Sequence, residues 1–279
     1  MTTKTSRKKA FMGIIIVDGC NPNGDPVYGN IPRTNYDGCG EISDVCLKRK
    51  IRNRVSALGH EIFIQDPACI TDGFDSLKER AEKAEFYSSL KKNANQYLDA
   101  AKKKWYDVRA FGQVFAFKGK QTESKTVGAR GCVTMSFATS ILPISIQDVT
   151  ITKIAPWYGD GKFKDTIGGK YIVKKAAYVF TGGISDQLAQ INGFTEDDAN
   201  LLKECIITMF EGDETSARPT GSMILSELFW WNYEDNKKHY NPVKLFRSVE
   251  VLPKDDFPYY EINRPCVCEE ITEEHITCL

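Results

Sequence analysis

The sequence lacks an excess of charge of either sign. Its 279 residues include 37 Lys and Arg and 37 Asp and Glu, so the formal net charge at pH 7 is zero. Domains that bind nucleic acid on their own usually carry a basic excess. Attraction to a polyanion would therefore have to come from local groups of cations and not from the chain as a whole.

The sequence also lacks an apolar run long enough to cross a membrane. The run from Phe11 to Val17 is too short, and a turn follows it in place of a cleavage site. The nine cysteines are scattered and form no Cys-x-x-Cys pair, which suits a reducing compartment. We expect no signal peptide, no membrane anchor and a cytoplasmic location.

No metal or cofactor motif is evident. Cys266, Cys268, His275 and Cys278 lie near one another in the sequence, but their spacing matches no common zinc site. We therefore expect no bound metal and no cofactor.

The charged residues are unevenly distributed. Cations cluster in four segments: Lys4–Lys9, Lys48–Arg54, Lys91–Lys104 and Lys118–Arg130. The last part of the chain is acidic, with Glu250, Asp255, Asp256, Glu261, Glu269, Glu270, Glu273 and Glu274. A basic face and an acidic end favour head-to-tail stacking with copies of the same chain.

The stretch from Asn21 to Arg54 is the most distinctive part of the chain. Up to Gly40 it places Pro22, Pro26 and Pro32 among several glycines. This composition bends the backbone repeatedly and is expected to leave many amides unpaired. Such a loop is able to face a ligand with its backbone.

A basic helix is predicted after this loop. Ser43 or Asp44 caps its first turn, and five cations follow: Lys48, Arg49, Lys50, Arg52 and Arg54. Cations near a helix N-terminus oppose the macrodipole by roughly a few tenths of a kcal/mol each, so their crowding has no evident stability reason. A nearby anion would remove the conflict, which predicts a phosphate receptor. A solvated basic helix face is the other interpretation, and it explains most runs of this kind.

The helical period predicts which residues of this helix are buried. Leu47, Ile51, Val55 and Leu58 fall on one stripe, which must face the core. Lys48 and Arg52 are then expected beside the stripe, Lys50 on the opposite flank, and Arg49 directed away from the core.

The rest of the chain predicts alternating strands and helices. Residues 59–76 are expected to be irregular, residues 76–105 to form one or two amphipathic helices, and the segment after Thr195 to form a helix capped by Thr195 with Asp198. Strands are expected at Phe11–Val17, Val108–Phe117, Cys132–Ile141, Ser145–Thr152, Tyr171–Phe180 and Met223–Trp231. Met223–Trp231 is expected to be the last core strand, and everything after Pro253 to be peripheral.

A long hairpin is predicted around the turn-rich segment Ala155–Gly169. Trp157, Tyr158 and Phe163 lie near its tip, interleaved with Lys162 and Lys164. Aromatic rings among cations are typical of surfaces that stack or wedge nucleic-acid bases. The same rings would also suit packing on a neighbouring subunit or on the hairpin's own stem.

The core order is therefore strand, helix, strand, strand, helix, strand. This is the ferredoxin-like α+β arrangement of RNA-recognition modules. No aromatic RNP1 motif is evident, which favours binding by the loops and the basic helix over stacking of bases on the sheet.

The blocks NPNGDP, GNIPR and SDVCLKRKIRNRV resemble the N-terminal motifs of the CRISPR-associated Cas-seven family, subtype I-C (the Csd-two type). DVRAFGQVFAF, the segment near Gly131 and TEDDANLLKECIITMFEGDETSARP match more loosely but in order. The resemblance therefore covers nearly the whole chain, and it implies a single RRM-like domain over residues 1–279. Its palm would comprise residues 1–58 and much of 128–250, with a helical finger at 59–127 and a thumb hairpin at 145–172.

The resemblance implies a non-catalytic subunit that polymerises along a CRISPR guide RNA (crRNA) and presents it to target DNA. Its partners would be crRNA, target DNA, other copies of itself and the Cas-five and Cas-eight types of Cascade subunit, with no membrane. The RNA-binding residues would be Asn23, Gly24, Arg33, Lys48, Arg49, Lys50, Arg52, Trp157, Lys162, Phe163 and Arg218.

Two other functions are considered. A metal-dependent ribonuclease, as in related type III subunits, would use Asp25 or Asp37, although no paired acidic motif accompanies them. A structural, self-associating protein without nucleic acid would suit the zero net charge.

Overall fold

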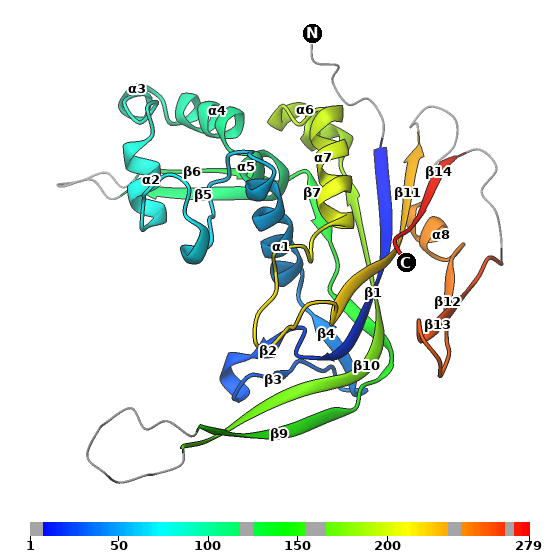
Figure 1. Ribbon diagram of the computed structural model, residues 1–279. Coiled ribbons are helices and arrows are strands. Elements are labelled where there is room, and N and C mark those ends of the chain that lie inside the picture. The colour runs from blue at the N-terminus through cyan, green and yellow to red at the C-terminus, as the bar shows by residue number, and fades with distance from the viewer. Residues whose placement is uncertain (1–7, 118–124, 154–165, 234–240, 266–270) are drawn as a thin grey trace, which may run out of the picture.

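The computed structural model describes residues 8–117, 125–153, 166–233, 241–265 and 271–279. The protein is a mixed α/β structure built on one large antiparallel sheet (Figure 1). The main strand order is β14-β11-β1-β10-β8-β4, and β7 and β9 also pair with β10. These strands span β1 Lys8–Cys20, β4 Cys39–Ile42, β7 Val133–Met135, β8 Ala138–Pro143, β9 Ile146–Lys153, β10 Thr166–Ile184, β11 Met223–Tyr233 and β14 Thr272–Thr277.

Strand β1 is the centre of the sheet, between β10 and β11. Phe11 and Ile15 enter the core on one face, whereas Met12 and Ile14 enter the core on the other face. A strand covered on both faces is apolar throughout and does not alternate with polar residues. The strand predicted at Phe11–Val17 is confirmed, and it is longer at both ends.

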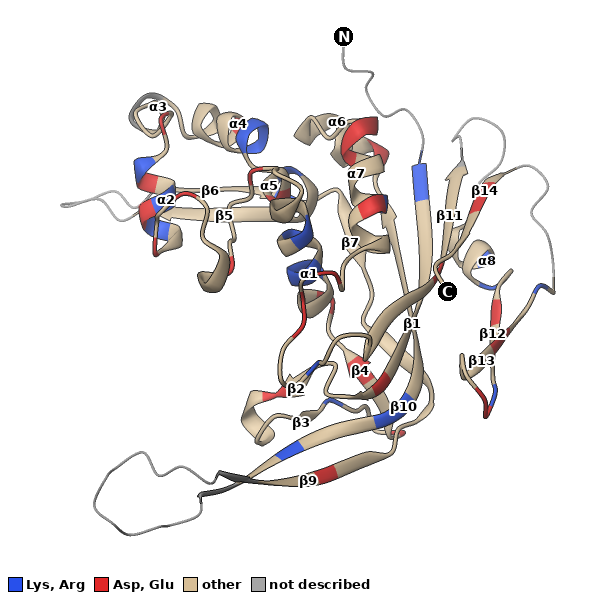
Figure 2. Ribbon diagram, viewed as in Figure 1, with Lys and Arg blue, Asp and Glu red and all other residues tan. Residues whose placement is uncertain are grey.

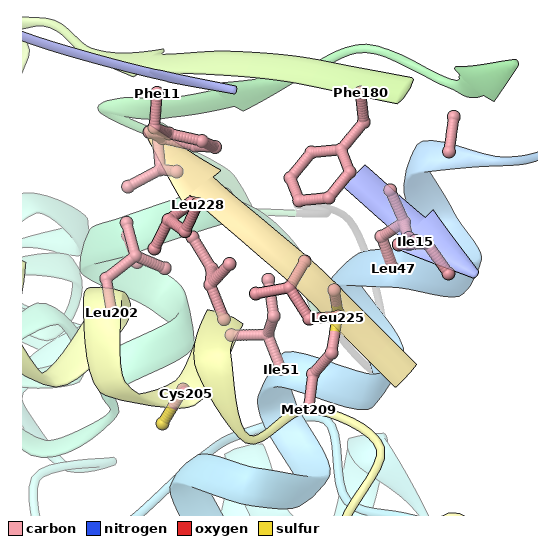
Figure 3. Packing of buried hydrophobic residues seen from close by; sticks show 14 of the residues in the cluster. Phe11, Ile15, Leu47, Ile51, Phe180, Leu202, Cys205, Met209, Leu225 and Leu228 are labelled. Carbon is pink, nitrogen blue, oxygen red and sulfur yellow. The ribbon is translucent and has the colours of Figure 1, made fainter. Parts of the chain in front are cut away.

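Different elements cover the two faces. Helices α1 (Asp44–Ala57), α6 (Asp186–Asn192) and α7 (Glu196–Ile207) lie on one face, as Figure 1 shows. Leu47 and Ile51 of α1 belong to the same buried cluster as Ile15 of β1 and Leu225 of β11 (Figure 3). The other face carries α8 (Pro242–Phe246) and the ribbon of β12 (Glu250–Pro253) and β13 (Tyr260–Asn263). Among the described residues, no helix is long and apolar enough to cross a membrane.

Helix starts follow the predicted caps. The Ser43 hydroxyl accepts a hydrogen bond from Cys46 N at 3.2 Å at the start of α1. At the start of α7, Thr195 Oγ1 accepts from Asp198 N at 3.2 Å, while Thr195 N donates to Asp198 Oδ2 at 2.9 Å. This reciprocal pair is the predicted capping pair, and it satisfies amides that the first turn leaves free.

Residues 59–117 and 125–130 form a lobe with its own core beside the sheet. The lobe contains η2 Pro67–Cys69, α2 Leu77–Lys83, α3 Ser89–Lys92, α4 Ala94–Lys104, α5 Tyr106–Phe111, and the hairpin of β5 Gly112–Phe117 and β6 Lys125–Arg130. Its core is aromatic, with Phe63, Tyr97, Trp105, Phe115 and Phe117 all buried. Three helices therefore stand where one or two were predicted.

The strand predicted at Val108–Phe117 is helical in its first part. Val108 and Ala110 are buried on α5, where Val108 packs in the core of the lobe and Ala110 packs in the core under the main sheet. Gly112, at φ 83°, ends the helix, and a Cβ there would lie 2.5 Å from the nitrogen of Gly131. Only from Gly112 onward is the predicted strand correct.

Two further predictions need correction. The strand expected at Cys132–Ile141 is interrupted between β7 and β8, where Ser136 N donates to Thr181 O at 2.8 Å and Ser136 Oγ accepts from Thr181 N at 2.9 Å. The tail is only partly peripheral, because β14 pairs with β11 as an edge strand of the main sheet. Trp231 Nε1 donates to Glu273 Oε2 at 2.7 Å across that pairing.

The predicted hairpin is present as β9 and β10. Their register runs from Ile146 opposite Val173 to Lys153 opposite Thr166, and the pair projects away from the sheet (Figure 1). Trp157, Lys162 and Phe163, the predicted wedge residues, lie outside the described residues.

Candidate nucleic-acid interface

The predicted loop, residues 21–40, is called the N-loop below. It contains β2 (Gly24–Asp25), η1 (Pro26–Tyr28) and β3 (Ile31–Pro32). The positive φ angles of Gly29 (66°) and Asn30 (61°) turn the chain back, so that β2 pairs with β3. The N-loop is therefore a small folded unit with its own two-stranded pairing.

Many N-loop amides are paired, contrary to the prediction. Arg33 N donates to Asn23 O at 3.1 Å, and Cys39 N donates to the side chain of Asn35 at 2.9 Å. Gly40 N donates to Ser140 Oγ at 2.8 Å. These amides form hydrogen bonds within the protein because a buried amide without a partner is costly.

The N-loop is bound to the elements on both sides of it. Asn23 Oδ1 accepts a hydrogen bond from Ser43 N at 2.9 Å, which joins the loop to the start of α1. Asn21 N donates to Ala217 O at 3.0 Å, which joins it to the loop between α7 and β11. These two bonds bring together residues that are far apart in sequence.

The cations of α1 each have a carboxylate partner within the protein. Figure 2 shows Lys and Arg along α1 and Asp and Glu along α7, the helix that packs beside it. The pairs are Lys48–Asp44 at 2.8 Å, Arg49–Asp66 at 3.1 Å, Lys50–Asp213, Arg52–Asp107 at 3.0 Å and Arg54–Glu211 at 2.6 Å. The argument that an external anion must relieve the macrodipole is therefore wrong, because these carboxylates supply the negative charge.

Two of these cations lie inside the fold. The side chain of Lys50 is 3% exposed and that of Arg52 is 11% exposed, whereas Lys48 and Arg49 are 21% and 38% exposed. Lobe helix α5 covers one flank of α1 and the end of α7 covers the other, so α1 has apolar and ionic buried faces. The predicted stripe of Leu47, Ile51 and Val55 is confirmed as buried, while Leu58 is half-buried.

Asp107 anchors Arg52 at the junction between the lobe and the sheet. Its carboxylate is 1% exposed and also accepts bonds from Phe63 N at 2.6 Å and Ile64 N at 3.0 Å. The guanidinium of Arg52 lies 5.0 Å from the centre of the Phe111 ring. The carboxylate of Asp107 is thus satisfied by Arg52 and by two backbone amides, as a buried charge requires. Because Arg52 belongs to α1 and Asp107 to α5, this ion pair fixes the lobe against α1.

A pocket of about 450 Å³ opens beside the N-loop, within the range of about 300–1,000 Å³ that is usual for ligand sites. Its walls come from the N-loop, the hairpin stem and the α7–β11 loop. They are Asn21, Asn23, Gly24, Gly29, Asn30, Gly169, Lys170, Tyr171, Ile172, Ala217 and Arg218. Asn23, Gly24 and Arg218 were predicted from sequence, and the structure brings these three together.

Lys170 and Tyr171 were missed as site residues. They were placed near the start of a predicted strand, and nothing local in the sequence directs them to the N-loop. Pairing of β9 with β10 carries the hairpin stem past β2 and β3, and β10 contacts β3. Their position at the base of a hairpin next to a glycine-rich loop is the signal that could have found them.

Gly24 has a steric reason to be glycine. A Cβ at this position would lie 2.8 Å from the carbonyl oxygen of Asn30 and 3.2 Å from Nδ2 of Asn21. Asn21 Nδ2 itself donates to Asn30 O at 2.7 Å. The absent side chain thus lets the two arms of the N-loop close and shapes the pocket wall.

Arg33 is held by its own loop. Its Nη1 lies 2.8 Å from Asp25 Oδ2, and its side chain is 34% exposed. Asp25 Oδ1 also accepts from Val27 N at 3.0 Å, whereas Asp37 is exposed. In the part of the chain that the structure describes, no group of three or more His, Cys, Asp or Glu side chains gathers as a metal site.

The thiols near this region are chemically subdued. Burial raises the pKa of the Cys20 and Cys46 thiols above their ordinary value, although Lys50 and Arg218 oppose the shift. Thiols with a raised pKa carry little thiolate at neutral pH and are poor nucleophiles.

The pocket lining contains two cations, Lys170 and Arg218, and several hydrogen-bonding side chains. These groups are suited to holding an anionic ligand.

The fold and the pocket define a mixed α/β protein with a basic pocket between a folded loop and a projecting hairpin. The chain belongs to the CRISPR-associated protein Cas7 family, because the family model of that description matches residues 7–266. A CRISPR-associated protein Cas7 of Haloferax volcanii is 30% identical over 128 residues, which cover 43% of this chain and 35% of the relative. The match thus spans about a third of that relative's length.

Two solved chains are also similar. One, described as a CRISPR RNA-guided surveillance complex, pre-nicking, aligns over 80% of this chain and 78% of its own length with a TM-score of 0.49. Another, described as a CRISPR RNA-guided surveillance complex, aligns over 84% and 73% with a TM-score of 0.43. Sequence identity is 13% in both alignments.

Proposed function

We propose that this protein is a non-catalytic backbone subunit of a type I-C CRISPR surveillance complex that holds crRNA. Membership of the Cas7 family supports the role as a subunit of a surveillance complex. The sequence blocks NPNGDP and GNIPR support the assignment to type I-C. The observation that carries RNA binding is the pocket of about 450 Å³, which joins Asn23, Gly24 and Arg218 to Lys170 and Tyr171. Contacts to phosphate and sugar from such a pocket leave base edges free to pair.

The predicted RNA-binding residues divide into groups by their surroundings. Asn23, Gly24 and Arg218 line the pocket, and Arg33 lies on the N-loop beside it. We assign the direct contacts with the RNA backbone to these four residues.

The four cations of α1 have a different role in this proposal. Lys48 and Arg49 are partly exposed and reach the RNA beyond the pocket. Lys50 and Arg52 are buried, so they act by holding Asp213 and Asp107 in place. Trp157, Lys162 and Phe163 are assigned to a base-displacing wedge on the hairpin.

We also propose a ferredoxin-like palm within a single domain of residues 1–279. The order β11-β1-β10-β8, with α1 between β1 and β8 and α7 between β10 and β11 along the chain, supports this assignment. The palm comprises residues 1–58 and much of 128–250, the finger residues 59–127, and the thumb residues 145–172. The separate aromatic core of the lobe supports the finger assignment.

In this proposal the chain works in the cytoplasm with several partners. They are crRNA, target DNA, further copies of itself, and subunits of the Cas-five and Cas-eight types. Successive copies bind side by side along one RNA. The hairpin of each copy reaches over the RNA segment that the neighbouring copy holds.

The first test is whether the purified chain carries RNA. We expect an absorbance ratio typical of nucleic acid and an RNA band on a denaturing gel. Arg218→Ala should then weaken binding of single-stranded RNA by about tenfold, the effect of one lost charged hydrogen bond of about 1.4 kcal/mol. Arg247→Ala is the matched control, because it removes an exposed arginine at the end of α8. Equal losses in both variants would argue against the pocket.

The ribonuclease is tested separately. Labelled RNA is incubated with the protein in magnesium or manganese, with and without a chelator. We expect intact RNA throughout. If the RNA is cleaved, and if cleavage is abolished both by the chelator and by Asp25→Ala or Asp37→Ala, the protein is a metal-dependent ribonuclease and the proposed non-catalytic role is wrong.

A further inference from the structure

Asp213 links α1 to the pocket through two cations. Its Oδ2 accepts from Lys50 Nζ and, at 3.0 Å, from Arg218 Nε. Lys50 is 3% exposed and Asp213 is 16% exposed, so this ion pair is mostly buried. Asp213 does not itself line the pocket, whereas Arg218 does. The contact therefore runs from the buried side of α1 to the ligand side of the loop.

The loop that carries Arg218 is fixed at its backbone as well. Thr215 N donates to Arg218 O at 2.9 Å and Arg218 N donates to Thr215 O at 3.0 Å. Asn21 N holds the neighbouring Ala217 through its carbonyl at 3.0 Å. With the backbone fixed, the direction of the guanidinium depends on the bond from Nε to Asp213. Within the described residues its two Nη groups have no hydrogen-bond partner, and the side chain is 26% exposed.

One carboxylate thus serves two cations, and the group of three keeps one positive charge. Of the three residues, only Arg218 lines the pocket. A guanidinium held through Nε presents its two Nη groups as a fork, which matches the geometry of a phosphate. A side chain ordered before binding loses less entropy when the ligand arrives.

We infer that Asp213 is a positioning residue that aims Arg218 at the RNA backbone, with Lys50 as the buried anchor that holds Asp213. This inference rests on the proposed function. It assigns to an acidic residue a favourable effect on the binding of a polyanion. The sign is opposite to that of simple electrostatics, in which removal of a nearby negative charge strengthens binding.

The test compares two acids of the same loop. Asp213→Asn and Glu214→Gln each remove one negative charge, but Glu214 is exposed and does not line the pocket. We expect Asp213→Asn to raise the Kd for single-stranded RNA by about fivefold, a normal size for coupling between contacting groups. Glu214→Gln should leave the Kd unchanged or lower it. Binding by Asp213→Asn that equals or exceeds wild type would overturn the inference.

A double-mutant cycle separates positioning from a general structural effect. In the Arg218→Ala background, Asp213→Asn should cause no further weakening, because the side chain that it positions is gone. The same fivefold loss in both backgrounds would show that Asp213 acts by another route and would overturn the inference.

Asp213→Asn leaves Lys50 buried without its partner and could prevent folding. The variant Lys50→Met with Asp213→Asn removes both charges, which is often neutral for stability, and frees Arg218 in the same way. We expect the same fivefold loss from this pair of substitutions, measured after thermal melting shows a folded chain. A folded double variant with wild-type affinity would overturn the inference while leaving RNA binding intact. A folded wild-type chain that binds no RNA would instead overturn the proposed function, and the inference with it.

Discussion

Asp107 and Asp213 each pair with a cation of α1, but they occupy different surroundings. Asp107 is 1% exposed and receives Arg52, Phe63 N and Ile64 N, so its oxygens face only protein. Asp213 is 16% exposed and is shared by Lys50 and by Arg218, which lines the pocket. The same kind of ion pair thus closes a structural junction on one flank of the helix and supports a wall of the pocket on the other.

The difference between the two carboxylates lies in what their cations can still do. Arg52 is enclosed between Asp107 and the Phe111 ring, so its charge is used within the fold. Arg218 uses Nε for Asp213 and keeps the rest of its guanidinium at the pocket. A run of cations in a sequence is therefore a poor guide to which of them reach a ligand.

Asp107→Ala should have the largest effect on stability. It leaves Arg52 buried and unpaired and removes the acceptor of two backbone amides, so we expect a loss of about 3–5 kcal/mol in the free energy of unfolding. Urea unfolding followed by circular dichroism measures it. Glu82→Ala is the control, because Glu82 pairs with Lys78 of the same helix, whose side chain is 77% exposed. Its expected cost is below about 1 kcal/mol, and equal costs for the two variants would contradict the comparison.

Gly24→Ala should damage the pocket more than the fold. The new Cβ would lie 2.8 Å from a backbone oxygen, so the N-loop must shift at a cost of about 1–3 kcal/mol. RNA affinity should fall with it, because the shift moves a pocket wall. Gly168→Ala on the hairpin is the control, since its Cβ would meet no atom closer than 4.0 Å. Wild-type RNA affinity for Gly24→Ala would contradict the assignment of this wall.

Arg49→Ala tests a cation of α1 whose side chain is more exposed than those of Lys50 and Arg52. Arg49 and Asp66 are 38% and 30% exposed, so we expect a stability change below about 1 kcal/mol. If Arg49 contacts phosphate, the salt dependence of RNA binding should flatten by about one unit of log slope or less. Titrations at several salt concentrations measure that slope. An unchanged slope would restrict the interface to the pocket.

The smallest effect is expected from acid titration of Asp66. The bond from Ala68 N, followed by that from Arg49, holds the pKa of this carboxyl below its ordinary value. A lowered pKa in the folded state means that the stabilisation is present above the unfolded pKa of about 3.9. It is lost as the pH falls through the folded value. Urea midpoints between about pH 5 and pH 3 should therefore fall more steeply for wild type than for Asp66→Asn, and parallel curves would contradict this.

Local patterns predicted much of the fold. The strand at Phe11–Val17, the cap at Ser43, the pair of Thr195 and Asp198, and the stem of the hairpin all stand where the sequence places them. These features depend on residues within a few positions of each other, so their physics is contained in short segments. The first part of Val108–Phe117 was misread because burial between two cores favours a helix where a short apolar run alone suggests a strand.

The candidate site was only partly predictable. Asn23, Gly24 and Arg218, which the sequence singled out, lie together in the pocket, but the burial of Lys50 and Arg52 was not predicted. Their partners Asp213 and Asp107 lie 163 and 55 positions away in the chain, and no local pattern links them. Lys170 and Tyr171 join the pocket for the same reason, through a hairpin that folds back past the N-loop.

The amino-acid sequence by itself determined most of the elements, their caps, the buried stripe of α1 and the family to which the chain belongs, because each is encoded by near neighbours or by contiguous motifs. Only the tertiary structure decided which cations face inward and which face the pocket. That choice depends on which carboxylates the packing of α5, α7 and the loop after α7 brings against α1, and a buried charge must find its partner within the fold.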